Sequence, residues 1–143
     1  MAGFFIALLS GALMSVQGVF NTQVTKTTGA SVSNVWVQFS ALAVCLGIWL
    51  CAGRDSLGAL ARVEPRYMLL GGAIGAGITW TVIRSMDQLG PAKAALLIVI
   101  AQLLVAYLIE LLGLFGVEQE PFAWRKAGGM ALALIGVAIF QWK

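Results

Sequence analysis

The sequence contains no histidine, only two cysteines and three prolines, and only 10% of its residues are charged. Without histidine there is no nucleophile–histidine pair of the kind that activates serine or cysteine, and no histidine-ligated metal. Glycine is plentiful, with 17 residues, yet no glycine-rich phosphate loop with its lysine occurs. We therefore predict that the protein is not an enzyme and holds no cofactor or metal.

The scarcity of charge also excludes an ordinary soluble domain. About a quarter of the residues of a soluble domain are charged, whereas 60% of this chain is hydrophobic. The net charge of +3 is modest and the basic residues fall between apolar runs, which indicates headgroup contact rather than nucleic-acid binding. Cys45 and Cys51 share one apolar run and are expected to be packing residues, because a helix holds them roughly 9 Å apart along its axis.

Five apolar runs are long enough to cross a bilayer as helices, at about 1.5 Å per residue against a hydrocarbon core of about 30 Å. They occupy residues 3–24, 31–52, 67–86, 91–114 and 124–142. We predict an all-α integral membrane protein in which these five transmembrane helices form a single transmembrane domain over residues 1–143.

An odd number of spans places the two termini on opposite sides, so the basic residues can be counted by side. One side holds Arg54, Arg62, Arg66, Arg125 and Lys126, and the other holds Lys26, Arg84, Lys93 and Lys143. Lysine and arginine are enriched in cytoplasmic loops, but the difference between the two sides is a single residue. So small a bias permits insertion in both orientations.

The first apolar run carries polar residues inside it. At about 100° per residue, a narrow arc of the helix contains Ser10, Met14, Gln17 and Asn21. An amide that faces lipid is costly, so this arc is expected to face other helices or a water-filled cavity. Either the amides hold helices together, as polar residues in membranes often do, or they line a solute site. We favour the solute site because the polar side chains cluster by angle near mid-depth.

Later runs contain further polar or aromatic side chains. Gln102 lies near the midpoint of its run, Trp80 lies well inside its span, and Asn34 and Gln38 are four residues apart on one helix face. Thr79 is a weaker candidate, because threonine can hydrogen-bond to its own helix backbone. The predicted solute contacts are Ser10, Gln17, Asn21, Gln38, Trp80 and Gln102.

Glu110 is the only carboxylate well inside an apolar run. Such residues are costly to bury and are often functional, so Glu110 is a candidate for proton coupling. The alternative is that Glu110, about a turn from the helix end, meets headgroups or a loop arginine such as Arg125, or hydrogen-bonds Tyr107. Both interpretations stay open at this point.

Small residues mark two of the runs. Gly71 and Gly75 form a small-xxx-small pair in the third, and the fifth contains Gly128, Gly129, Ala133 and Gly136. Small residues let helix backbones approach closely where lipid supplies no hydrophobic drive. We expect a packing face in the fifth helix, and either a packing face or a cavity wall in the third.

The C-terminal half reads LGPAKAALLIVIAQLLVAYLIELLGLFG at residues 89–116 and EQEPFAWRKAGGMALALIGVAIF at residues 118–140. A short hairpin, a glutamine-bearing helix, an exit rich in glycine and phenylalanine, and a final glycine-rich helix follow one another. Together with Gln17, Asn21 and the glycines of residues 71–77, this pattern resembles the YdcZ-like family of five-helix membrane proteins. That family belongs to the drug/metabolite transporter superfamily, and the resemblance covers nearly the whole chain.

The resemblance implies a small subunit that is half of a transporter. In this superfamily, larger members carry two five-helix repeats in inverted orientation, and smaller members dimerise antiparallel. It therefore implies a homodimer, or a heterodimer with a related five-helix subunit, in the bacterial cytoplasmic (inner) membrane. The site of an inverted pair lies at the repeat interface near mid-depth, where Gln17, Asn21 and Gln102 are expected.

Small multidrug exporters of the same superfamily carry a first-helix glutamate that binds proton and cation in turn, followed twelve residues later by a glycine. Here Gly29 follows Gln17 at that spacing, so a glutamine stands in the place of the glutamate. Because an amide does not titrate, the resemblance implies a site for neutral polar solutes, or for cations with little need of a counter-charge.

Two functional hypotheses follow. The leading one is a transporter of a small organic solute that works in the lipid bilayer by alternating access, as an antiparallel dimer. The alternative is a non-transporting membrane subunit that packs on a partner protein through its glycine faces. The two differ in whether water reaches Gln17.

Overall fold

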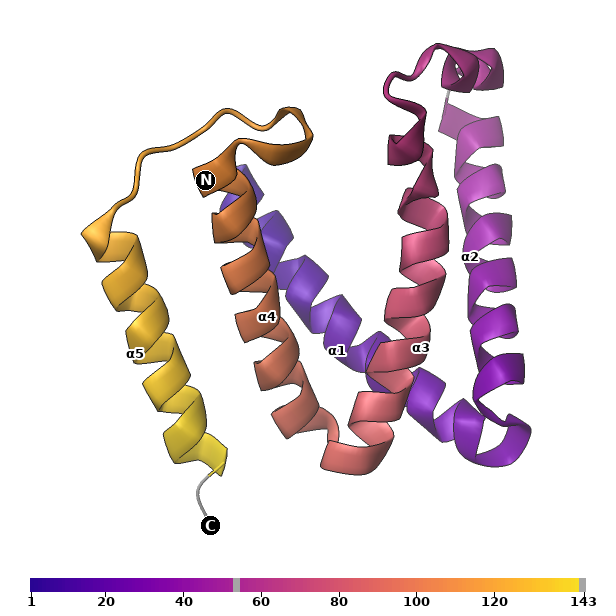
Figure 1. Cartoon of the computed structure of the whole chain (residues 1–143). Helices are drawn as coiled ribbons and strands as arrows, with labels where there is room; N and C mark the ends of the chain where they lie inside the picture. Colours follow the sequence, from indigo (N-terminus) through magenta and orange to yellow (C-terminus); the bar gives the residue numbers. More distant parts are fainter. Residues whose placement is uncertain (53–54, 142–143) are drawn as a thin grey trace. The chain divides into compact units, whose positions relative to one another are not determined.

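The structure, a computed structural model, describes residues 1–52 and 55–141, and over these residues it is all-helical (Figure 1). The described α-helices are α1 (Ala2–Thr28), α2 (Ala30–Ala52), α3 (Gly71–Leu89), α4 (Pro91–Leu112) and α5 (Trp124–Gln141). Short 3-10 helices are η1 (Leu57–Arg62), η2 (Arg66–Leu70) and η3 (Leu114–Gly116). Three residues used in the sequence predictions lie outside the described part, namely Arg54, Trp142 and Lys143.

Four segments of the described chain are long and apolar enough to cross a membrane: α1, α2, η2 with α3, and α4. The remaining helix, α5, has 18 residues, and its first turn contains Arg125 and Lys126, which lower its hydropathy. The prediction of an all-helical membrane protein is thus confirmed for four candidate spans plus a fifth helix. A fifth span and a single transmembrane domain remain predictions.

The helix ends follow backbone chemistry rather than hydropathy. The first apolar run ends at Val24, but α1 continues to Thr28 because the polar residues 25–28 also take a helical backbone. Gly29 ends α1 with φ 83° and ψ 155°, a conformation that is essentially restricted to glycine. The amide of Gly29 donates to the Thr25 carbonyl over 2.8 Å, and its carbonyl accepts from the Ser33 amide over 3.0 Å. One residue therefore ends α1 and starts α2.

Gly90 adopts nearly the same backbone conformation between α3 and α4, with φ 82° and ψ 157°. Its carbonyl accepts from the Ala94 amide over 3.1 Å, and Pro91 follows as the first residue of α4. Proline fits there because the first helical position needs no amide donor. The glycine–proline pair therefore fixes the beginning of α4.

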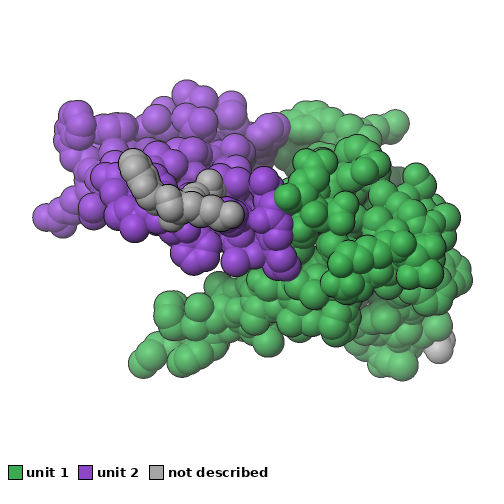
Figure 2. Space-filling model, turned by 90° about the horizontal axis from the view of Figure 1, so that it is seen from below, with its two compact units in different colours: residues 1–88 green, residues 89–143 purple. Residues whose placement is uncertain are grey.

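The described chain divides into two compact units, residues 1–88 and residues 89–143, coloured green and purple in Figure 2. The first unit contains α1, α2 and α3, and the second contains α4 and α5. In the second unit α5 packs on α4, and the Ala123 amide donates to the Tyr107 hydroxyl over 3.1 Å. The functional residues of each unit are described separately below.

Within the first unit, α1 packs against α2 near the turn that joins them. Ser33 of α2 is fully buried there, and its hydroxyl donates to the backbone carbonyl of Asn21 over 3.1 Å. Thr22 is also buried, and its hydroxyl donates to the Gly18 carbonyl of its own helix over 2.8 Å. Both bonds satisfy buried hydroxyls, and the Ser33 bond fixes α2 beside the C-terminal half of α1.

The contact between α1 and α3 is made at Gly18. A Cβ atom at this position would stand 2.5 Å from both Sδ and Cε of Met86 and 3.5 Å from Cγ1 of Val82. Figure 1 shows the purple part of α1 crossing α3. The absence of a side chain at Gly18 therefore permits the close approach of these two helices.

The glycines chosen from the sequence do not make such contacts within the described chain. A Cβ atom added at Gly71, Gly75, Gly128 or Gly136 would meet no atom within 4 Å. In α5, Ala133 of the expected face lies against α4, where it lines a small apolar space with Ile100 and Leu104, whereas the glycines of that face make no such contact. A glycine pattern shows that close approach is possible but not which surface approaches. Many large apolar side chains are also exposed, as a lipid-facing surface requires.

Candidate functional site

The polar arc of α1 borders an open hollow of about 520 Å³. Ser10, Gln17 and Asn21 line this hollow, together with the apolar side chains of Leu13, Met14, Val16 and Phe20. The α-helical repeat brings Ser10, Met14, Gln17 and Asn21 to one face, as the sequence pattern predicts. Three of the six predicted solute contacts therefore lie together on one helix face.

A second, smaller cavity of about 50 Å³ lies between α1 and α3. From α1 it is lined by Met14, Gln17, Gly18 and Asn21, and from α3 by Ile78, Thr79 and Val82. Gln17 and Asn21 line both spaces. The two amides therefore stand where the inter-helix cavity meets the open hollow.

The side-chain amides of Gln17 and Asn21 make no hydrogen bond to any described residue. The Ser10 hydroxyl, in contrast, donates to the Ile6 carbonyl of its own helix over 2.9 Å. Each amide has two donor hydrogens and an acceptor oxygen. Within the described chain these groups are free to bind water or a polar solute.

Gln38 is held in a polar network between α2 and α3. The Asn34 side-chain amide donates to the Ala76 carbonyl over 3.2 Å. Gln38 Nε2 donates to Asn34 Oδ1 over 3.4 Å and to the Thr79 hydroxyl over 3.2 Å. The Thr79 hydroxyl donates in turn to the Gly75 carbonyl over 3.0 Å. Gln38 therefore contacts the lining of the smaller cavity through its hydrogen bond to Thr79, and it lines neither of the two spaces.

Trp80 and Gln102 lie away from the lining of both spaces. The Trp80 ring is covered by the guanidinium of Arg84, at 5.4 Å from the ring centroid, a distance typical of a cation–π contact. Gln102 is an exposed residue of α4 in the second unit, and its side chain makes no hydrogen bond within residues 1–52 and 55–141. Their predicted roles as solute contacts stay predictions.

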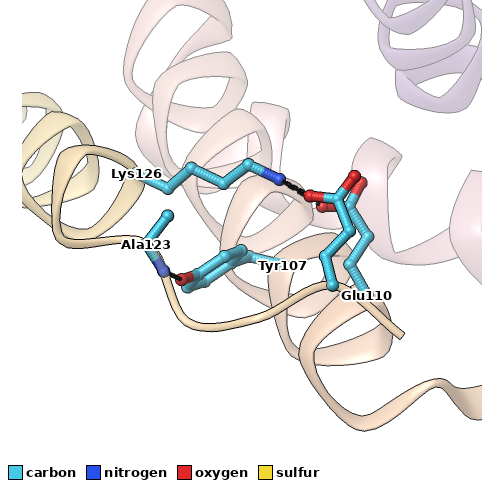
Figure 3. Close-up of polar contacts among 5 residues, drawn as sticks. Tyr107, Glu110, Ala123 and Lys126 are labelled. Carbon is cyan, nitrogen blue, oxygen red and sulfur yellow. Dashed lines mark hydrogen bonds and ion pairs between the residues drawn. The ribbon is translucent and has the colours of Figure 1, made fainter. Parts of the chain in front are cut away.

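Glu110 forms an ion pair across the α4–α5 connection (Figure 3). Lys126 Nζ lies 3.0 Å from Glu110 Oε2 and also contacts the carboxylate of Glu120. The Tyr107 hydroxyl accepts from the Ala123 amide, so its described bond is not with Glu110. The partner of Glu110 is thus Lys126, where the sequence suggested Arg125, because the connection places Lys126 within reach of α4.

Replacing Glu110 by glutamine tests whether this ion pair is structural or couples transport to protons. The side chains of Glu110 and Lys126 are 42% and 43% exposed, and exposed pairs contribute little to stability. We expect Glu110→Gln to lower the melting temperature in detergent by no more than about 3 °C, and to leave the response of uptake to a pH gradient unchanged.

Glu118→Gln is the matched control, because Glu118 is exposed and has no ion pair among the described residues. Loss of the pH-gradient response in Glu110→Gln alone, at an unchanged melting temperature, would instead assign proton coupling to Glu110.

Sequence reasoning missed the placement of Gly18 and underrated Thr79. Thr79 does bond its own backbone, as expected of a helical threonine, but its oxygen also faces Gln38 and its side chain lines the smaller cavity. The spacing of Asn34 and Gln38 was the available signal. Two polar residues one turn apart on the same face of a membrane helix are expected to hydrogen-bond polar groups of the facing helix. Over the described residues, no group of three or more histidine, cysteine, aspartate or glutamate side chains could hold a metal ion.

Comparison with known proteins places the chain in a family. Residues 2–139 match the model of the YdcZ family of drug/metabolite transporters (DMT), described as "Putative inner membrane exporter, YdcZ". No curated protein and no solved structure matches the chain. The match covers nearly all 143 residues, and it agrees with the four candidate spans. The chain therefore belongs to the YdcZ family and is a helical protein of the inner membrane.

Proposed function

We propose that the protein is a transporter subunit that moves a small, neutral, polar organic solute by alternating access. The observation that carries this proposal is the position of the Gln17 and Asn21 amides, which line both the open hollow and the smaller cavity without a hydrogen-bond partner in the described chain. The family description is that of an exporter, a transport class rather than an enzymatic one.

The chemistry of the lining indicates the class of solute. An amide left unpaired in an apolar setting is costly, so a site that retains two of them is suited to a ligand that completes their hydrogen bonds. The residues that line the two spaces include no acid and no base. A charged solute would lose its hydration there without gaining a counter-charge. A neutral solute with hydrogen-bonding groups and some apolar surface fits best.

The proposed working unit is an antiparallel dimer, either of two copies or of this chain with a related five-helix subunit. The hollow over α1 is open, so a second subunit that covers this face would close the chamber near mid-depth, as in transporters built from inverted repeats. The nearly even distribution of lysine and arginine favours insertion in both orientations. The glycines that meet no atom within the chain leave surface for such a contact.

Cysteine accessibility tests the chamber. In a background with Cys45→Ser and Cys51→Ser, since both natural thiols are free and exposed, Gln17→Cys is compared with Ser15→Cys. Ser15 lies two residues earlier, about 200° around the helix, and lines neither space. We expect a membrane-impermeant thiol reagent to modify position 17 at least about tenfold faster, because lipid suppresses the reactive thiolate.

Uptake into proteoliposomes tests transport itself. A panel of radiolabelled probes comprises nicotinamide, adenosine and mannitol as neutral solutes and tetraethylammonium as a cation. We expect uptake of at least one neutral probe and none of the cation. Equal, slow modification of positions 15 and 17 without uptake of any probe would favour the packing subunit. Acid-quenched binding of tetraethylammonium that persists in Glu110→Gln would contradict a neutral-solute site.

A further inference from the structure

We propose that Thr79 is a fixed hydrogen-bond acceptor of the solute site, which selects neutral solutes that carry an N–H or O–H donor. Asn34 and Gln38 are then positioning residues that hold the Thr79 hydroxyl in this state. This inference rests on the proposed function and names the class of solute for the same cavity.

Thr79 is well placed to contact a solute. It lies on α3, is half-buried, and lines the smaller cavity opposite Gln17 and Asn21 of α1. The other residues that line this cavity are Met14, Gly18, Ile78 and Val82, none of which has a strong hydrogen-bonding side chain. The polar chemistry of the cavity thus depends on two amides and one hydroxyl.

The backbone of α3 fixes the orientation of Asn34. A carbonyl oxygen only accepts hydrogen bonds, so the side-chain atom of Asn34 that faces the Ala76 carbonyl over 3.2 Å must be the nitrogen. The Asn34 oxygen then faces Gln38, and the atom of Gln38 that meets it must also be a nitrogen. Each amide orientation follows from the one before it.

The same nitrogen of Gln38 also meets the Thr79 hydroxyl over 3.2 Å, so the Thr79 oxygen accepts there. The single hydroxyl proton of Thr79 is donated to the Gly75 carbonyl over 3.0 Å. A hydroxyl has one donor hydrogen and two acceptor lone pairs. Thr79 therefore has one lone pair left and no proton, so it offers a solute an acceptor only.

Thr79 differs from the two amides because its hydroxyl can only accept a hydrogen bond from a solute. Gln17 and Asn21 have free donors and acceptors, and rotation of the amide lets either end face a solute. They can therefore bind donors and acceptors alike. If a solute oxygen that carries no hydrogen lies against Thr79, it faces the Thr79 oxygen and neither of the two gains a hydrogen bond. The cavity thus discriminates by the presence of a donor on the solute.

The experiment uses the full chain in lipid nanodiscs with a thiol reporter. Met14→Cys is introduced into the Cys45→Ser, Cys51→Ser background, because Met14 lines both spaces but is not part of the hydrogen-bonding set. The probes are benzyl alcohol and benzyl methyl ether, which are both neutral and differ in the O–H donor. The measured quantity is the concentration of each probe that halves the rate of modification by a soluble thiol reagent.

For each variant we take the protecting concentration of the ether divided by that of benzyl alcohol. We expect this ratio to be about five- to tenfold higher with Thr79 present than in Thr79→Val. Comparing ratios between variants cancels the different partition of the two probes into lipid. Valine keeps the branched shape of threonine and removes the hydroxyl, and Thr79→Ser is expected to retain the preference. Gln38→Met is expected to reduce the preference by improving protection by the ether, because the freed hydroxyl can then rotate and donate.

The outcomes separate this inference from the proposed function. A reporter at position 14 that does not react with the soluble reagent overturns both, since the cavity is then dry. If the reporter reacts but neither probe protects it, the role of Thr79 is overturned. The same holds if the ratio of the two protecting concentrations is equal in Thr79→Val and in the chain with Thr79. In both cases the water-filled chamber of the proposed function is still supported. Loss of the preference in Thr79→Val but not in Gln38→Met overturns the positioning role of Gln38 alone.

Discussion

Replacing Gln17 by leucine is expected to reduce uptake of the best neutral probe by about 10- to 100-fold, because the solute loses up to two amide hydrogen bonds of about 1 kcal/mol each. Gln17 lines both the hollow and the smaller cavity, and its amide has no partner in the described chain. The substitution removes a polar group from an apolar helix and leaves every described hydrogen bond intact. The melting temperature in detergent should therefore stay the same or rise.

Gln23→Leu is the matched control for this result. Gln23 is an exposed glutamine of the same helix and lines neither space. Uptake by Gln23→Leu should remain close to that of the natural chain. If Gln17→Leu and Gln23→Leu transport equally well, Gln17 is not part of a solute site. If Gln17→Leu instead unfolds in detergent, Gln17 holds helices together.

Replacing Gly18 by leucine is expected to separate α1 from α3 and abolish uptake. A Cβ atom at position 18 would stand 2.5 Å from two atoms of Met86, and leucine adds further carbons in the same direction. The flexible end of Met86 can move aside for an alanine, but a leucine overpacks the crossing. We expect the free energy of unfolding to fall by about 1–3 kcal/mol, as is usual for overpacked cores, which thermal denaturation in detergent measures.

Two further variants test the cause of this loss. Gly11→Leu places the same side chain on the same helix, where a Cβ atom meets nothing within 4 Å, and should be tolerated. The double variant Gly18→Leu with Met86→Ala removes the obstructing side chain and should recover much of the stability. A destabilisation that is as large in Gly11→Leu, or that Met86→Ala does not relieve, would show that steric conflict at the α1–α3 crossing is not the cause.

The sequence predicts the elements of this fold well, because a membrane helix is defined by its own composition. The apolar run at residues 91–114 and the observed helix Pro91–Leu112 differ at one end only, where Gly113 takes a left-handed conformation. The face shared by Ser10, Gln17 and Asn21 also follows from helical periodicity alone. Such features are local, so that one sequence is enough to predict them.

Contacts between helices depend on which surfaces meet, and composition alone does not determine this. The glycine pair Gly71 and Gly75 carries the stronger packing pattern, yet the close crossing is made at Gly18. Glu110 pairs with Lys126 rather than with its neighbour Arg125, because adjacent residues of α5 point about 100° apart and Lys126 is on the side that faces Glu110. Thr79 accepts a hydrogen bond from Gln38 on another helix, a contact that the sequence around Thr79 does not reveal.

The single glycine between α1 and α2 also limits how the protein can be handled. At Gly29 the polypeptide reverses without forming a loop, so this rim offers no room for an epitope tag or a protease recognition sequence. One inserted residue would shift α2 along α1 and pull Ser33 away from the Asn21 carbonyl. The irregular stretch around Glu118, before α5, is exposed instead, and labels or fusion partners belong there.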